Sequence, residues 1–149
     1  MAAPDTAIQE QVKHQIFDLW VNDNSGFNSA INGMFPGKYP SGITQDDFPL
    51  VTLNIITSDV GYTFDDSQVP HFEEIIIHFL LLSSTLDTDE ITDVLDKLEA
   101  LYDGASLDLT GWGLLEMTRI PGNAVVGPFL DEDEVWNITI KYSVSCEKD

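Results

Sequence analysis

Apolar and polar residues alternate along two stretches of the chain, and each alternation predicts a β-strand. In residues 49–58, "PLVTLNIITS", Val51, Leu53 and Ile55 share one parity, while Thr52 and Asn54 share the other. A longer alternation runs to the end of the printed sequence. Its inward positions are Trp136, Ile138, Ile140, Tyr142, Val144 and Cys146. Because successive side chains of a strand point to opposite faces, each stretch should place one face against a core.

A third strand is predicted at residues 71–85, "HFEEIIIHFLLLSST", where both parities are apolar. Such a strand should be covered on both faces. We expect a helix to cover one face and a neighbouring subunit to cover the other, because a small single-layer domain rarely supplies two covers. A fourth strand is predicted at residues 111–120, followed by the turn "PGN", a short "AVVGPF" and the acidic turn Asp131–Glu134.

Two segments have the spacing of amphipathic helices. The first spans residues 5–23, and the second is "LDTDEITDVLDKLEALYDG", residues 86–104. In the second, Asp87 and Glu90 have the spacing of a capping box, and Gly104 stands where a helix C-cap belongs. The apolar stripes of the two helices comprise Ile8, Val12, Ile16, Leu19 and Trp20, and Ile91, Val94, Leu95, Leu98 and Tyr102.

Residues 24–48 hold four glycines and two prolines and are predicted to form a long loop with a short helical turn near Ala30 and Ile31. The order of elements is therefore helix, loop, strand, strand, helix, strand, strand. This order predicts an α+β fold, with an antiparallel sheet of about four strands and two helices packed on one face. The length of 149 residues fits a single domain over residues 1–149.

The chain is strongly acidic, with 26 Asp and Glu against six Lys and Arg and a formal net charge of -20. Because 43% of the residues are hydrophobic, the charge does not indicate disorder. The acids are dispersed along the whole sequence, which favours adaptation to concentrated salt, where carboxylates keep a surface hydrated. The few basic residues are scattered, so sequence-specific nucleic-acid binding is not expected. No segment resembles a secretory signal or a membrane span, and we expect a soluble protein.

No catalytic, cofactor-binding or metal-binding residues are predicted, and we do not expect an enzyme. The three histidines, His14, His71 and His78, show no ligand spacing. "GNAVVG" lacks the Lys and Ser or Thr of a phosphate loop, and carboxylate pairs are too common for any one to indicate a cation site. Cys146 is the only cysteine, which excludes an intramolecular disulfide and suggests a small core residue.

The elements "FPLVTLNI", "EEIIIHFLLLSS", "EITDVLDKLEALYDG" and "DEVWNITIKYSVSCE" follow a first helix in an order that resembles tail-terminator, or tail-completion, proteins of long-tailed, siphovirus-like viruses. The resemblance covers most of the chain and rests on element order. It implies a small α+β sandwich without catalytic residues or cofactors, assembled as a ring, usually of six copies, on the head-proximal end of the tail tube. Together with the acidity, it suggests a virus of a halophilic archaeon.

That resemblance implies a homo-oligomeric ring as well as contacts with the major tail tube protein and with a head-completion or neck protein. It also implies a place at the head-tail junction of the virion, assembly in the host cytoplasm, and a lumen through which DNA passes without sequence-specific binding. Two alternatives stay open: another neck component, such as a head-completion or adaptor protein, and a monomeric acidic module that binds a basic partner or a cation.

Aromatic and methionine residues in two predicted loops are candidates for a subunit or tube interface, because such side chains often anchor interfaces. "GMFPGKYP" contributes Met34, Phe35 and Tyr39, and "DVGYTFDDSQ" contributes Tyr62 and Phe64. The alternative is that these side chains fold back over the ends of the sheet.

Overall fold

The computed structural model describes residues 8–23, 26–38, 41–62, 70–120 and 124–148. These residues form three α-helices, a 3-10 turn and six strands. The helices are α1 (Ile8–Val21), α2 (Phe27–Ala30) and α3 (Asp89–Tyr102), and the 3-10 turn is η1 (Gln45–Asp47). The strands are β1 (Met34–Pro36), β2 (Leu50–Tyr62), β3 (Pro70–Ser83), β4 (Trp112–Arg119), β5 (Val125–Leu130) and β6 (Trp136–Lys148).

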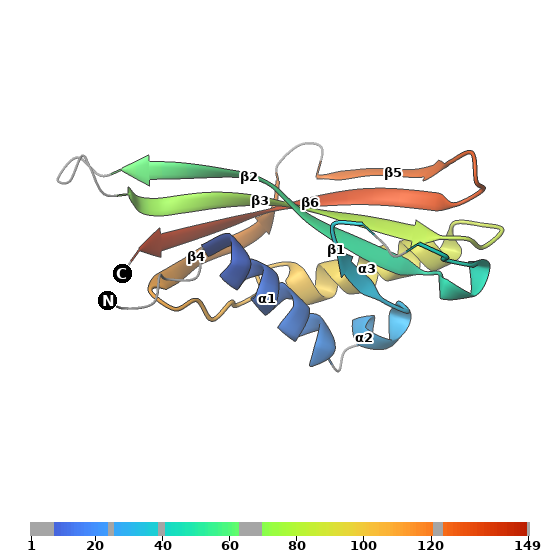
Figure 1. Cartoon of the computed structure of the whole chain (residues 1–149), viewed down its shortest axis with the longest axis horizontal. Coiled ribbons are helices and arrows are strands. Elements are labelled where there is room, and N and C mark those ends of the chain that lie inside the picture. Colours follow the sequence, from blue (N-terminus) through green and yellow to red (C-terminus); the bar gives the residue numbers. More distant parts are fainter. Residues whose placement is uncertain (1–7, 24–25, 39–40, 63–69, 121–123, 149) are drawn as a thin grey trace.

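The strands make one sheet in the order β1-β2-β3-β6-β4, with β5 also paired to β6 (Figure 1). All pairs are antiparallel except β1 with β2. β4 pairs with residues 142–148 of β6 and β5 with residues 136–140, so the two follow one another along the same edge of β6. They therefore act as one interrupted edge strand, and β5 forms a hairpin with the start of β6.

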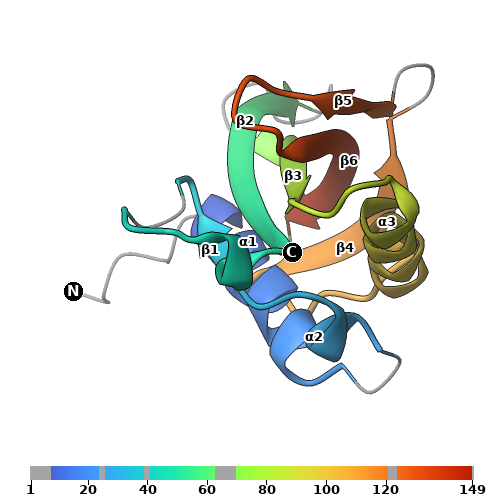
Figure 2. The same cartoon turned by 90° about the vertical axis from the view of Figure 1, so that its right-hand side faces the viewer.

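The helices lie on one side of the β2-β3-β6 sheet, as the two perpendicular views show (Figures 1 and 2). The core between the two layers contains the inward residues of the strands and the apolar stripes of α1 and α3. Its largest fully buried side chains are Tyr102, Tyr142, Phe27, Phe79, Ile16, Leu53, Ile75, Ile77, Leu81, Ile91 and Leu98. The opposite side of the sheet has no helix on it in the described part of the chain.

The predicted α+β class is confirmed, but the prediction of about four strands and two helices was too low. The three-residue β1 and the four-residue α2 both lie within the segment predicted as a loop, residues 24–48. Elements of three or four residues are too short to show a hydrophobic period, and β1 forms only because β2 offers it a parallel partner. The helical turn expected near Ala30 is present as α2.

The capping-box pairing expected between Asp87 and Glu90 does not form. The helix begins later than predicted, with Thr88 as its N-cap. The Asp87 carboxylate accepts the Asp89 N–H at 3.1 Å, and the Glu90 carboxylate accepts the Ser83 hydroxyl at 2.7 Å. Gly104, at φ +67°, follows the end of the helix as predicted.

On the helix side of the sheet, two tyrosine hydroxyls donate hydrogen bonds. Tyr102 donates to the Ile16 carbonyl at 2.8 Å, which ties α3 to α1. Tyr142 of β6 donates to the Asp103 carboxylate at 2.7 Å. Arg119 of β4 pairs with Asp103 at 3.0 Å and also with Glu99 of α3. Burial raises the pKa of both tyrosines, and for Tyr142 the bond to Asp103 raises it further. The end of α3 is thereby joined to the sheet through polar contacts as well as packing.

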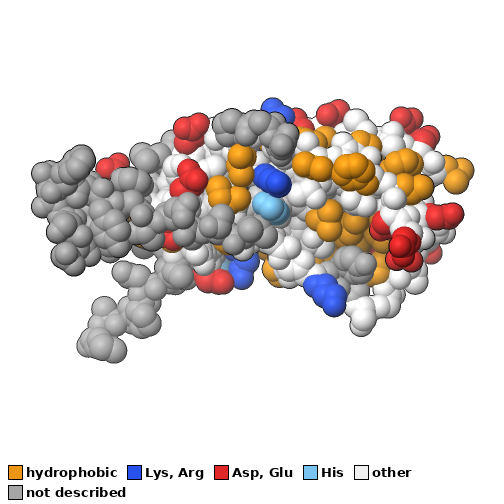
Figure 3. Space-filling view, turned by 90° about the horizontal axis from the view of Figure 1, so that it is seen from above, with side chains coloured by type: hydrophobic (Ala, Val, Ile, Leu, Met, Phe, Trp, Pro, Cys, Tyr) orange, Lys and Arg blue, Asp and Glu red, His pale blue; other side chains and the backbone are white. Residues whose placement is uncertain are grey.

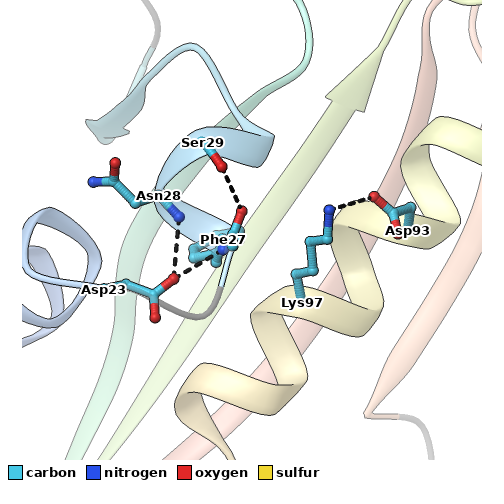
Figure 4. A network of polar contacts seen from close by, with 7 residues as sticks. Asp23, Phe27, Asn28, Ser29, Asp93 and Lys97 are labelled. Atoms are coloured by element: carbon cyan, nitrogen blue, oxygen red, sulfur yellow. Dashed lines mark hydrogen bonds and ion pairs between the residues drawn. The ribbon is translucent and has the colours of Figure 1, made fainter.

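The short helix α2 is held between the two longer helices (Figure 4). The Asp23 carboxylate accepts the N–H groups of Phe27 at 2.8 Å and Asn28 at 3.1 Å, so it satisfies two of the four donors that the first turn leaves without a helical partner. Lys97 of α3, paired with Asp93 at 2.9 Å, passes close to Gly26. The Phe27 side chain is fully buried and meets Tyr102 edge to face.

Cys146 is fully buried, which confirms the prediction of a core residue. Burial, and to a lesser degree Glu73, raises the pKa of its thiol from 9.0 to about 11. At pH 8 its thiolate fraction should thus be roughly a hundredfold below that of an unperturbed thiol. We expect iodoacetamide to label the unfolded chain quickly and the native protein only as it unfolds.

The raised pKa of the Cys146 thiol also makes the stability of the fold depend on pH. The unfolded chain loses the Cys146 proton at lower pH than the folded chain, so this group should lower stability as the pH rises from 9.0 toward about 11. Equal labelling rates at pH 8 in native buffer and in denaturant would contradict the burial of this thiol.

Candidate assembly surfaces

The sheet face opposite the helices is the first candidate surface. On the helix side of β3, Ile75, Ile77 and Phe79 are fully buried, whereas Ile76 and Leu80 on the other side are only half-buried. The sequence predicted that both faces of this strand need a cover. The helices supply one cover. On the other face, which Figure 3 shows, the middle of the strand is only half-buried, whereas Leu50, Thr52 and Leu82 at one end of the face are buried.

Polar residues cross the middle of this face in register. Asn54 of β2 lies opposite His78 of β3, which in turn lies opposite Lys141 of β6. Burial lowers the pKa of His78, and the nearby charge of Lys141 lowers it further, so the imidazole is neutral at pH 7. A histidine and basic side chains are visible near the middle of this face in Figure 3. The positive charge at the centre of the row is therefore that of Lys141.

Lys141 differs from most of the few basic residues. Lys13 pairs with Glu10, Lys97 with Asp93, and Arg119 with two carboxylates. Among the described residues, no carboxylate lies within ion-pair distance of Lys141. We define the open face as Ile76, His78, Leu80, Thr139, Lys141 and Ser143, all of them half-buried. It combines apolar surface with one cation that has no carboxylate partner in the described part of its own chain.

The second candidate surface is the β5–β6 hairpin. Five of the six residues of β5 are exposed, including Val126 at 36%, Phe129 at 57% and Leu130 at 53%. In the turn that follows, the Asp131 carboxylate accepts the N–H groups of Asp133 and Val135 at 2.9 and 3.0 Å. We define the hairpin tip as Phe129–Glu134. It presents two large apolar side chains beside four exposed acids.

A hollow of about 580 Å³ lies at the same end of the sheet. Its apolar lining includes Ile43, Phe48, Leu86, Leu130 and Trp136, and Leu86 is fully exposed. Asp133 and Glu134 stand at its border. Within the described part of the chain, no three His, Cys, Asp or Glu side chains come together as they would around a metal ion. The hollow therefore suits an apolar group with a basic neighbour better than a bare cation.

The interface residues predicted from sequence occupy different environments. Met34 is 5% exposed and belongs to the core, because β1 pairs with β2 and turns this side chain inward. Met34 is therefore not a surface anchor but follows the alternative of folding back over the sheet. Phe35 is half-buried and packs against Gly33. Tyr39 and Phe64 lie outside the described residues, and the side chain of Tyr62 does as well, so these three remain predictions.

The exposed apolar residues of the hairpin tip were not among the interface candidates predicted from sequence. Phe129 and Leu130 follow a Gly-Pro pair in "VVGPFL", which is apolar on both parities in a segment too short to be buried on both faces. That combination was a usable signal for an uncovered edge. Lys141 has no such signal, because its position opposite His78 depends on strand register.

Comparisons with known proteins identify a fold but no family. No protein-family model and no curated protein matches the sequence. Among solved structures, the fold is similar to a chain from "Virion of native gene transfer agent (GTA) particle", with a TM-score of 0.73 and 10% sequence identity. The match covers 95% of this chain and 98% of the other. No helix in the described residues is long and apolar enough to cross a membrane.

Proposed function

We propose that this protein is a structural, non-catalytic virion subunit that assembles as a ring of six copies at the head-proximal end of a viral tail tube. There it would end tube polymerisation and join the tail to the head. The observation that carries the proposal is the similarity of fold to a virion-particle chain over nearly the full length of both chains. The order of elements, which resembles tail-terminator proteins, supports the same role.

The exposed surfaces also support assembly. The open face and the hairpin tip both leave apolar side chains accessible in the isolated subunit, and such surfaces commonly mark contacts with other proteins. The partners in this proposal are further copies of the chain, the major tail tube protein and a head-completion or neck protein. DNA would pass through the lumen without sequence-specific binding, and the acidic surface would keep it from adhering.

The acidity belongs to the same proposal. Six copies at -20 each carry a formal charge of -120, so subunits can approach one another only where salt screens their repulsion. At about 1 M salt the Debye length is about 3 Å, which removes most of that repulsion. The proposed setting is a virus that assembles in the cytoplasm of a halophilic archaeon.

The first test is the molar mass by light scattering in about 2 M and about 0.1 M salt, a range over which screening changes severalfold. We expect a closed oligomer near six times 16.6 kDa at the higher salt and smaller species at the lower. Binding to purified tail tubes would then separate a terminator from another neck component, which should bind filled heads instead.

A well-folded monomer at both salts that also fails to bind tail tubes would contradict the proposal. The hollow beside Leu86, bordered by Asp133 and Glu134, favours one second candidate in that case, which is a monomeric module that binds a basic, partly apolar segment.

A further inference from the structure

We propose that the hairpin tip of one copy docks on the open face of the next, with the carboxylates of Glu132 and Asp133 facing Lys141. This inference rests on the proposed function, because it assigns the contact between neighbouring copies in the ring. It specifies which surface of one subunit contacts which surface of the next.

The open face has the chemistry of a receptor for an acidic, apolar segment. Lys141 is half-buried and, among the described residues, has no carboxylate partner. Its neighbour His78 is neutral at pH 7 and offers a hydrogen bond without adding charge. Ile76 and Leu80 lie on the same face of β3 as His78, one at each side of it. A partner here should bring apolar side chains together with a carboxylate.

The hairpin tip has the complementary chemistry. Phe129 and Leu130 are more than half exposed, and Glu132 and Asp133 are exposed beside them. The Asp131 carboxylate is occupied by two N–H groups and fixes the turn. In the described part of the chain, no side-chain bond or ion pair engages the carboxylates of Glu132 and Asp133. These two are therefore available to a cation outside the subunit.

The tip cannot reach Lys141 of its own chain. Lys141 lies five residues along β6 from Trp136, where the hairpin turn ends, and a strand rises about 3.3 Å per residue, so the separation is roughly 16 Å. Contact between the two surfaces thus requires a second molecule. Because the surfaces differ, the contact is heterologous, and repeated heterologous contacts close into a ring when the rotation permits.

A second copy fits better than a protein of opposite charge. A basic partner would be attracted to acids over the whole surface and would gain nothing from Lys141. An acidic partner, in contrast, would pair with Lys141, which no carboxylate among the described residues of its own chain engages. A copy of this chain supplies acids and exposed apolar side chains on the same turn. The contact also covers both surfaces that the isolated subunit leaves accessible.

The test is a charge exchange, performed at the lowest salt at which the wild-type chain assembles. Lys141→Glu should raise the concentration needed for assembly at least about tenfold, because like charges then face each other across the contact. The double variant Glu132→Lys, Asp133→Lys should do the same from the other side. The matched control is Lys13→Glu on α1, which changes the charge equally and should assemble as the wild type does.

Mixing the two defective proteins in equal amounts supplies the decisive measurement. In an alternating ring, every open face with the Lys141→Glu substitution meets a tip that carries the two new lysines, and every unchanged open face meets an acidic tip. Assembly should therefore return to within about threefold of the wild type, as paired charges across an interface are strongly coupled. Circular dichroism and unfolding midpoints of each variant should match the wild type, which shows that each subunit is folded.

Normal assembly of Lys141→Glu, or a mixture of folded variants that stays unassembled, would overturn this contact and leave the ring proposal standing. Wild-type protein that neither self-associates at any salt nor binds tail tubes would overturn both. Assembly that only a basic foreign protein induces would also count against the contact, because it would assign the acids of the tip to another partner.

Discussion

Phe79→Ala should lower the free energy of unfolding by about 3–5 kcal/mol, the usual cost of removing a large buried aromatic side chain. Phe79 is fully buried on β3, the strand that pairs with both β2 and β6. Its ring stacks on Tyr102 at 5.0 Å and meets Tyr142 edge to face at 5.8 Å. The substitution leaves a cavity where helix α3 packs on the centre of the sheet, and the neighbouring rings are too rigid to fill it.

Urea unfolding at fixed salt measures this effect, and Phe129→Ala is the matched control. Phe129 is 57% exposed, so its loss should change the free energy of unfolding by no more than about 0.5 kcal/mol. The same control variant should assemble poorly, because Phe129 belongs to the hairpin tip. Equal destabilisation by both substitutions would mean that the core is not centred on Phe79.

Much of the fold follows from local patterns in the sequence. In α3 the predicted stripe is buried at Ile91, Val94, Leu98 and Tyr102, and only Leu95 is half-buried. In β6 the predicted inward positions from Ile138 onward are all buried. Both patterns are periodic over a dozen residues, and in each case the period alone determines which side chains face the core.

The pairing of strands could not be read in the same way. Sequence predicted a strand at residues 111–120 and only a short segment at 124–129, and it did not predict that both would pair along one edge of β6. Such pairing depends on the path of the chain between the strands and produces no pattern in the local sequence. Met34 was predicted as an interface residue for a related reason. Its neighbours in the sequence are typical of a loop and do not indicate the short parallel pairing with Val51 that turns its side chain inward.

The open face, too, could be predicted from sequence only in part. The apolar residues on both parities of β3 predicted that the face away from the helices also needs a cover. In the structure Ile76 and Leu80 on that face are only half-buried, although Leu82 at its end is buried. The position of Lys141 beside His78 could not be predicted, because it follows from the register between strands far apart in the sequence. A residue pattern can thus indicate that a face needs a partner, while the chemistry of that partner becomes visible only when the strands are paired.

Gly127→Ala should release β5 from the sheet and prevent assembly while most of the subunit stays folded. Gly127 has φ +114°, and an added Cβ would lie 2.7 Å from the Asn137 carbonyl oxygen. The strained backbone and the clash together should cost about 2–4 kcal/mol. Because the side chains of β5 beyond Val125 are exposed, little packing opposes its detachment, so the strain should be relieved locally rather than by global unfolding.

Hydrogen exchange resolved by residue measures this release. The amides that pair β5 with β6 should exchange at least about tenfold faster in the variant, while those between β2 and β3 keep their protection. Gly42→Ala is the control, because Gly42 has φ +84° but no atom of the described residues within 4 Å of an added Cβ. It should cost only the backbone strain, about 1–2 kcal/mol, and assemble normally. If Gly127→Ala kept β5 paired and still failed to assemble, the position of the hairpin would not explain the defect. If β5 lost its pairing and assembly stayed intact, the hairpin tip would not be part of the contact between subunits.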